Sequence, residues 1–313
     1  MDKDEKIVEV RNLCKDFKVR TRIFKAVTDL SFSIPRGIIC GFVGPNGAGK
    51  TTTIKMLVGT SFPTSGEVFI GGNKIPSFEA RSLIGYVPEK YVFYDDMLPE
   101  NYLVYLAELS GVNKDEAKKR AIQILKMLEL YEHRDKQIGS FSSGMKQKMS
   151  LAQAIIHNPR ILILDEPTSN LDPLAKHQFL EILKSLVKQR GIAILISSHH
   201  LEELEKIIDK VVIINRGKLI VESYMKDLAS REKKLEIEVS NPAKVAKLIK
   251  DALNLAVGIE GNKIYIPLGK YDLPKLKKYI MGLIMNAGEE IFSMGIKTRS
   301  LDDLFLGLMK DGE

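Results

Sequence analysis

The chain has little cysteine and no long apolar run. Its two cysteines, Cys14 and Cys40, are too few for a framework of disulfide bridges and lack metal-ligand spacing, so we expect a reducing compartment. No segment approaches the roughly 18 consecutive apolar residues that cross a bilayer. The stretch from Met1 to Lys6 is mostly charged and lacks the apolar core of a signal peptide. These absences predict a cytoplasmic chain; if it works at a membrane, another chain supplies the membrane part.

A concentrated basic tract is also missing. The net charge is +7, but it is spread along the chain, and from residue 231 onward there are 14 basic against 12 acidic residues. Nucleic acids and anionic membranes are bound by clustered positive charge. Solvated surface lysines explain the charge better, so we expect no specific nucleic-acid partner.

The length of 313 residues is enough for one large domain and a smaller one. Residues 1–230 mix short apolar strands with helices and predict an α/β domain. Within it, helical periodicity from about Leu98 to His157 predicts an inserted helical lobe. Asp172 followed by proline predicts the start of a helix that runs to about Gln189. Residues 231–313 predict a small α+β domain that ends in a helix and carries no catalytic constellation.

The most informative stretch lies between an apolar run, Ile38 to Val43, and a predicted helix, Thr51 to Gly59. This strand-to-helix turn has the spacing G-x-x-x-x-G-K-[ST] of a phosphate-binding loop. Its glycines let successive N–H groups converge on phosphate oxygens, and the helix directs its positive end to the same anion. The predicted nucleotide-binding residues here are Gly44, Pro45, Asn46, Gly47, Ala48, Gly49, Lys50, Thr51 and Thr52.

Two residues of this loop have specific expected tasks. Lys50 is expected to reach the β- and γ-phosphates, and the Thr51 hydroxyl to hold Mg²⁺. The alternative is a glycine-rich turn with a surface lysine. It is weaker, because a cation in the first turn opposes the helix dipole by roughly 0.3–1 kcal/mol unless an anion is bound there. The loop alone does not separate kinases, GTPases and ATPases.

Two acids follow an unbroken aliphatic run, Ile161 to Leu164, that is typical of a buried central strand. Asp165 and Glu166 are expensive to desolvate there unless Mg²⁺ and a phosphate-bound water compensate them. Because neighbouring strand residues point to opposite sides, Asp165 is expected to face the metal and Glu166 the attacking water. A pair of solvated loop acids is the alternative, which the upstream phosphate loop makes the weaker one.

Three other residues are candidates for nucleotide or metal binding because of their positions in the sequence. Glu89 follows the predicted strand Leu83 to Val87, and His199 follows Gly191 to Ser197; ligands gather at such strand ends in open α/β sheets. In isolation, a histidine there is more often structural than catalytic. Phe17, in a basic stretch, either stacks on an adenine ring or packs under the sheet edge.

The order of these motifs resembles one family, the ATP-binding subunits of ABC transporters, from Ile7 to about Val221. The phosphate loop resembles the Walker A motif, and the strand ending in Asp165 resembles Walker B. Glu166 then resembles the catalytic glutamate, and residues 169–172 resemble the D-loop. The resemblance implies a P-loop ABC ATPase core with an inserted helical subdomain at about 98–157, followed by the accessory domain.

Residues 142–145 resemble the signature of that family. Ser142 and Gly144 keep the positions expected to contact the γ-phosphate at a helix N-terminus, whereas Ser143 and Met145 replace the usual glycine and glutamine. Without the resemblance, Ser142 is simply a good helix N-cap. Phe17 resembles the adenine-stacking aromatic, and His199 the switch histidine.

The residue matching the usual Q-loop glutamine is Glu89. A carboxylate there still binds Mg²⁺ or orients water, but it adds negative charge, which leaves metal affinity and pH dependence open. Glu89, Thr51 and Asp165 are therefore the expected metal ligands, and Glu166, His199 and Lys50 the expected catalytic residues.

The resemblance implies a dimer, homomeric or with a homologous ATPase, in which each ATP lies between one subunit's phosphate loop and the other's signature. Residues 231–313, and their ending Ser300 to Phe305 most closely, resemble the C-terminal extension of exporter subunits whose ABC-2 permease is a separate chain. The protein would then sit on the inner face of the cell membrane, with Tyr91, Phe93 and Tyr94 either contacting the permease or buried in the lobe. The rival interpretation is a soluble ABC-type ATPase acting on nucleic acid or ribosomes. It usually carries two cassettes or a long coiled-coil insertion, and neither is found here.

Overall fold

The computed structural model describes residues 5–199, 201–231, 233–268 and 272–298. It divides the chain into two compact units, Met1–Ser223 and Tyr224–Glu313. The sequence-based boundary at residue 230 falls within helix α8 (Met225–Arg231), which belongs to the second unit.

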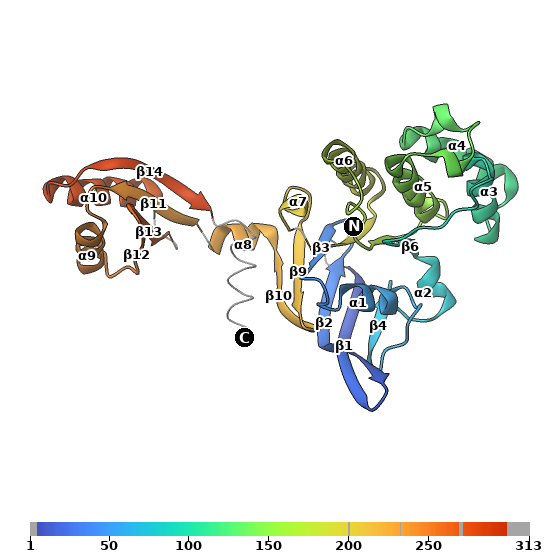
Figure 1. Ribbon diagram of the computed structural model, residues 1–313, viewed down its shortest axis with the longest axis horizontal. Helices are drawn as coiled ribbons and strands as arrows, with labels where there is room; N and C mark the ends of the chain where they lie inside the picture. The colour runs from blue at the N-terminus through green and yellow to red at the C-terminus, as the bar shows by residue number, and fades with distance from the viewer. Residues whose placement is uncertain (1–4, 200, 232, 269–271, 299–313) are drawn as a thin grey trace. The chain divides into compact units, whose positions relative to one another are not determined.

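The strand before the phosphate loop belongs to a six-stranded sheet (Figure 1). In order across the sheet, its strands are β10 (Lys218–Tyr224), β9 (Lys210–Asn215), β3 (Ile39–Val43), β8 (Ala193–Ser198), β7 (Ile161–Leu164) and β6 (Ile84–Val87). The neighbours from β9 to β6 pair in parallel. Strands β3, β7 and β8 are buried along their whole length, as parallel strands covered on both faces must be. The prediction of buried strands at these places is confirmed.

A second, antiparallel sheet of four strands packs against the first. Its order is β2 (Arg22–Pro35), β1 (Lys6–Val19), β4 (Ser65–Ile70) and β5 (Asn73–Lys74). Helix α1 (Lys50–Leu57) contributes Ile54 and Leu57 to a core that both sheets share. Phe32 of β2 stacks on Phe42 of β3, with ring centroids 5.5 Å apart. This core fixes the phosphate loop and α1 against both sheets.

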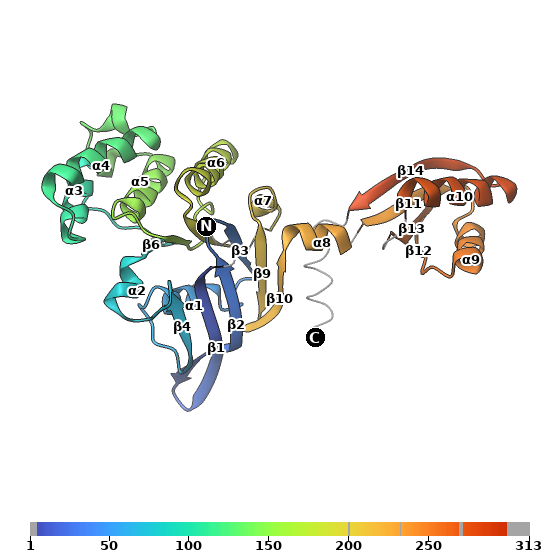
Figure 2. The same cartoon turned by 180° about the vertical axis from the view of Figure 1, so that it is seen from behind.

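The predicted helical segment is confirmed. It contains α3 (Pro99–Leu109), α4 (Lys114–Met127) and α5 (Ser143–Ile155), which lie together at one end of the first unit in both views (Figures 1 and 2). Ser142 caps α5 and accepts a hydrogen bond from the Met145 N–H. Asp172 caps α6 (Pro173–Arg190) in the same way, as its sequence predicts. Three short α-helices were not predicted: α2 (Phe78–Ser82), α7 (Leu201–Glu205) and α8.

The structure gives the second unit a more specific topology than the predicted α+β class. After α8, its elements are β11 (Lys233–Val239), α9 (Pro242–Leu253), β12 (Gly258–Glu260), β13 (Lys263–Pro267), α10 (Leu273–Asn286) and β14 (Ile291–Thr298). The sheet order β12-β13-β11-β14 and its antiparallel pairing give a β-α-β-β-α-β fold of ferredoxin-like topology. The predicted final helix, Leu301 to Met309, lies outside the described residues.

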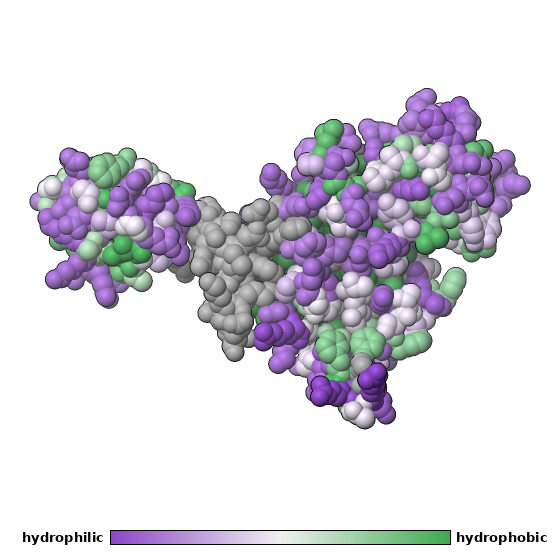
Figure 3. All heavy atoms as spheres, in the orientation of Figure 1, coloured by the Kyte–Doolittle hydropathy of each residue, from purple (hydrophilic) through white to green (hydrophobic). Residues whose placement is uncertain are grey.

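Apolar residues do not dominate the exterior. Hydrophilic residues cover most of the face seen in Figure 3, and hydrophobic ones form small, separate patches there. In the part of the chain that the structure describes, no helix is both long and apolar enough to span a bilayer.

Candidate functional site

The phosphate loop depends on its glycines for conformation and for space. Gly47 and Gly49 take positive φ angles of 81° and 101°, a region that residues with a Cβ adopt only under strain. A Cβ at Gly44 would collide with the backbone carbonyl oxygen of Ile214 in β9. The loop geometry therefore requires glycine for a reason independent of the sequence motif.

Lys50 opens α1 and is only 6% exposed. Its Nζ donates hydrogen bonds to the carbonyl oxygens of Gly44 at 2.7 Å and Pro45 at 3.2 Å. The same Nζ lies 3.3 Å from Oε1 of Glu166. A buried cation needs such partners, and all of them belong to the phosphate loop or to the acid pair.

The parallel register brings several strand ends to one edge of the sheet. Val43 of β3 pairs with Ser198 of β8, and Leu164 of β7 pairs with both Ile196 of β8 and Val87 of β6. Side chains that follow these strands are therefore neighbours although they are far apart in sequence. They are Glu89, Asp165, Glu166 and His199.

Asp165 is almost completely buried. Its Oδ1 accepts a hydrogen bond from the Ser197 hydroxyl at 2.8 Å and a longer one from the Thr51 hydroxyl at 3.4 Å. Burial raises the pKa of Asp165; the hydrogen bonds from Ser197 and Thr51 lower it, and the charges of Glu166 and Glu89 raise it again. A buried carboxylate with acidic neighbours favours a cation at this position.

The oxygen ligands at this edge suit Mg²⁺. Magnesium at nucleotide sites is held by one or two carboxylates together with substrate phosphates and water. Asp165, Thr51 and Glu89 supply such oxygen atoms. Across the described ranges, no group of three His, Cys, Asp or Glu side chains is arranged to hold a metal by itself. The site therefore fits a metal that binds with nucleotide.

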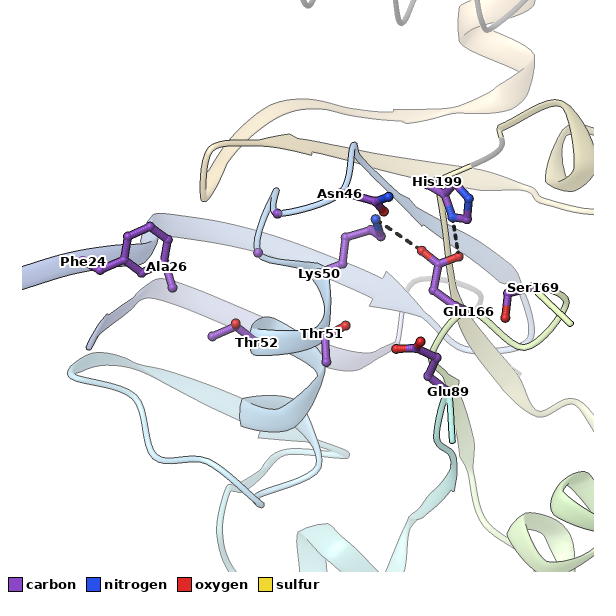
Figure 4. Close-up of a pocket in the computed structure, with 12 residues that line it drawn as sticks. Phe24, Ala26, Asn46, Lys50, Thr51, Thr52, Glu89, Glu166, Ser169 and His199 are labelled. Carbon is purple, nitrogen blue, oxygen red and sulfur yellow. Dashed lines mark hydrogen bonds and ion pairs between the residues drawn. The ribbon is translucent and has the colours of Figure 1, made fainter. Parts of the chain in front are cut away.

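Glu166 is held between two basic side chains. Its Oε2 lies 2.8 Å from Nδ1 of His199, and its Oε1 faces Lys50, as the dashed lines in Figure 4 mark. A carboxylate accepts hydrogen bonds, so in this contact Nδ1 of His199 carries the proton. The backbone N–H of Glu166 donates to the Ser197 hydroxyl at 2.8 Å. Asp165 and Glu166 thus have different partners. Strand alternation does not explain this, because β7 ends at Leu164 and Glu166 has a φ angle of +48°.

A cavity of about 410 Å³ is lined by Lys50, Thr51, Glu89, Glu166 and His199, whereas Asp165 lies behind its wall. Figure 4 shows Glu166 and His199 toward one end and Phe24 with Ala26 toward the other. Phe17, the predicted adenine-stacking residue, does not line the cavity. It is the cross-strand partner of Phe24 in the β1–β2 ladder, so both rings lie on the same face of the sheet. Phe24 is 58% exposed and Phe17 41% exposed.

The signature residues lie in a different cavity, of about 330 Å³. Ser142 and Gly144 line it at the N-terminus of α5, together with Asp172 at the start of α6. Among the residues that the structure describes, this cavity and the one at the phosphate loop share no lining residue. Within one chain, the signature is not brought to the phosphate loop.

The residues predicted from the phosphate loop and the strand ends fall into two groups: some line the phosphate-loop cavity, and the others lie behind its lining. The lining residues from the prediction are Asn46, Gly47, Gly49, Lys50, Thr51, Thr52, Glu89, Glu166 and His199. Gly44, Pro45 and Ala48 do not line it and shape the loop instead, Ala48 being buried in the core. Sequence reasoning missed Phe24 and Ser197. A hairpin register counted from a turn at Arg20 would have placed Phe24 opposite Phe17.

Comparison with known proteins gives the family. A family model described as "ABC transporter" matches residues 27–169. An uncharacterized ABC transporter ATP-binding protein, YhcH of Bacillus subtilis strain 168, is 33% identical over 96% of this chain and 95% of its own. The bacitracin transport ATP-binding protein BcrA of Bacillus licheniformis is 37% identical over 92% of this chain and 94% of its own.

Solved structures agree with this assignment. The structure of an ATP-binding subunit of an ABC transporter matches with a TM-score of 0.63 and 31% identity, over 71% of this chain and 91% of that one. A dimeric, post-hydrolysis ATP-binding cassette bound to ADP and Pi matches with a TM-score of 0.63 and 24% identity, over 70% of this chain and 98% of that one, and shares the fold. The phosphate loop, the acid pair and these relatives together show that the chain belongs to the ATP-binding proteins of ABC transporters.

Proposed function

We propose that this chain binds MgATP and hydrolyses it to drive a separate membrane permease of an exporter. The observation that carries the proposal is the position of Glu166 beside the phosphate loop, with its carboxylate between Lys50 and His199. A carboxylate held in this way can accept a proton from water next to a bound γ-phosphate.

The cavity offers a place for each part of the nucleotide. The phosphates are bound by the loop from Gly44 to Thr51 and by Lys50. The base stacks at Phe24 on the aromatic end of the cavity, and Phe17, its exposed cross-strand neighbour, stands beside Phe24 outside the cavity lining. Asp165, Thr51 and Glu89 would hold Mg²⁺, which would supply positive charge next to the phosphates.

The residues of this chain divide the hydrolytic step among them. Glu166 acts as general base on the attacking water, and His199 keeps the Glu166 carboxylate oriented through its Nδ1 proton. Lys50 leaves Glu166 for the phosphates, which frees the base and places a positive charge where negative charge develops. Nucleotide binding and activation of the base are therefore linked through one lysine.

Two copies are needed for a complete site. Ser142 and Gly144 lie in a cavity separate from the phosphate loop, so the signature of one copy acts on the nucleotide of another. The solved cassette with ADP and Pi, which has the same fold, is a dimer, and this supports the arrangement. The partner is a second copy of this chain or a homologous ATPase.

An exposed aromatic surface next to Glu89 is the proposed contact with the permease. Val92 is 88% exposed and Tyr94 60% exposed. Phe93 and Tyr94 both contact the ring of Tyr102 in α3, so the loop is anchored to the helical lobe while Val92 and Tyr94 remain exposed. Through this contact the chain would work on the inner face of the cell membrane.

Export is the proposed direction, because relatives over much of the chain are named for it or for transport of an antibiotic. Nod factor export ATP-binding protein I of Burkholderia orbicola is 39% identical over 63% of this chain, and BcrA is named for bacitracin transport. A soluble ATPase acting on nucleic acid or ribosomes remains the rival, and no clustered positive charge in the sequence favours it.

The variant Glu166→Gln tests the proposal. It keeps the size of the side chain but cannot take a proton, so turnover of ATP should fall about 10²- to 10⁴-fold while ATP still binds. Lys50→Ala is the companion variant, and it should lose nucleotide binding itself. Near-normal hydrolysis by Glu166→Gln would remove Glu166 from the mechanism.

A further inference from the structure

One buried hydroxyl connects the two acids of the site. Ser197 lies in β8 beside the end of β7, because Ile196 and Leu164 are register partners. Its side chain is completely buried. Its Oγ lies 2.8 Å from Oδ1 of Asp165 and 2.8 Å from the backbone nitrogen of Glu166.

The chemistry of these groups fixes the direction of both hydrogen bonds. A backbone N–H can only donate, so the Ser197 oxygen accepts from Glu166. The single hydroxyl proton is then donated to the Asp165 carboxylate. One side chain thereby sets the position of the Asp165 carboxylate relative to the backbone of Glu166.

The backbone of Glu166 needs such support. Its φ angle is +48°, in the left-handed region that is unfavourable for a residue with a Cβ. Two hydrogen bonds hold it there: its N–H donates to Ser197, and its carbonyl accepts from the Ser169 N–H at 3.3 Å. In this conformation the side chain reaches both Lys50 and His199. A return to negative φ would redirect the Cα–Cβ bond and carry the carboxylate away from both.

We propose that Ser197 is a positioning residue for ATP hydrolysis, which holds Glu166 in the left-handed conformation that aims its carboxylate between Lys50 and His199. The inference rests on the proposed function, since it needs Glu166 as the general base. Ser197 itself does not contact the nucleotide and does not line the cavity. Its effect through Glu166 is therefore on the chemical step, and saturating Mg²⁺ in the assays keeps its second partner, Asp165, from limiting the rate.

The test compares two substitutions of Ser197 with a matched control. Ser197→Ala removes both hydrogen bonds, and Ser197→Cys keeps nearly the same volume while offering only a weak donor and acceptor. Ser150→Ala is the control, because Ser150 is also completely buried but its hydroxyl has no hydrogen-bond partner among the described residues. If the alanine variant does not fold, as judged by thermal unfolding, the cysteine variant carries the test.

We expect kcat to fall about 10- to 100-fold in both Ser197 variants, because misplacement of a reacting group by about 1 Å has effects of this size. The KM for MgATP and the affinity for ADP should change by less than about threefold, and Ser150→Ala should behave as the parent. An unchanged kcat, or a loss of affinity with kcat retained, would overturn the proposal.

Measuring the effect of Ser197→Ala a second time, in the Glu166→Gln variant, separates positioning of Glu166 from general damage to the fold. In single-turnover assays on Glu166→Gln, adding Ser197→Ala should lower the residual rate by less than about threefold, since coupled residues are not additive. An equal loss in both backgrounds would contradict a role through Glu166. If Glu166→Gln alone keeps normal turnover, the proposed function fails; if it is inactive while Ser197→Ala is active, only the positioning role fails.

Discussion

Lys50 cannot fully serve Glu166 and a nucleotide phosphate at the same time. Its Nζ lies 3.3 Å from Oε1 of Glu166, and both side chains are largely buried. A phosphate that binds Lys50 competes with this ion pair. Glu166→Gln removes the charge from that competition and keeps the shape of the side chain. We therefore predict that Glu166→Gln tightens the binding of ADP as well as ATP.

The size of this effect follows from the geometry. At 3.3 Å the Coulomb energy of the pair is about 5 kcal/mol with an effective dielectric constant of about 20. Desolvation of the two charges offsets much of it, and hydrogen bonds to charged groups contribute about 1.5–3 kcal/mol net. A tenfold change in affinity corresponds to about 1.4 kcal/mol, so ADP should bind about 10- to 100-fold more tightly.

The assay is an equilibrium titration with ADP in EDTA, which takes metal binding out of the comparison. Glu89→Gln is the matched control, because Glu89 lines the same cavity and loses the same charge, yet makes no ion pair with Lys50 among the described residues. It should change ADP affinity by less than about threefold. Unchanged affinity in Glu166→Gln, or equal tightening in Glu89→Gln, would refute the competition for Lys50.

Phe24→Ala should weaken ADP binding by about 1–3 kcal/mol if the base stacks on it, and Phe17→Ala by less; a larger effect of Phe17 in the same titration would move the base to that ring. Burial raises the pKa of Asp165 in the folded chain, so the folded chain loses stability as pH rises above the ordinary aspartate pKa, and the loss is complete above the raised pKa. Asp165→Asn should therefore raise the melting temperature of the nucleotide-free chain at pH 7, and the gain should vanish below about pH 4; a lowered melting temperature at pH 7 would contradict this. Val92→Asp, at an exposed site outside the cavity, should leave basal ATPase activity unchanged but reduce co-purification of the permease, and full retention would exclude this surface.

Much of the site could be predicted because it depends on strand ends. An unbroken aliphatic run indicates a buried parallel strand, and the residue after it must lie at the edge where the neighbouring strands also end. Asp165, Glu89 and His199 were found in this way, and the register brings them to one edge. The phosphate loop was found because its spacing reflects backbone conformation, with positive φ at Gly47 and Gly49.

Features that depend on local register or on long-range order could not be predicted so well. Phe24 was missed because the position of the β1–β2 turn decides which aromatic reaches the cavity. Ser197 was missed because a serine at the end of an apolar strand looks like a tolerated core residue until its partners are known. The ferredoxin-like order of the second unit depends on which strands pair, and an α+β pattern does not determine that.

The most direct test of the account is purification of the tagged chain in mild detergent from the membranes of its own source, with its partners identified by mass spectrometry. The account predicts a protein with several membrane-spanning segments in stoichiometric amount, recovered with the parent chain and reduced with Val92→Asp. Recovery of ribosomes or nucleic acid with no membrane protein would contradict it and favour the soluble ATPase.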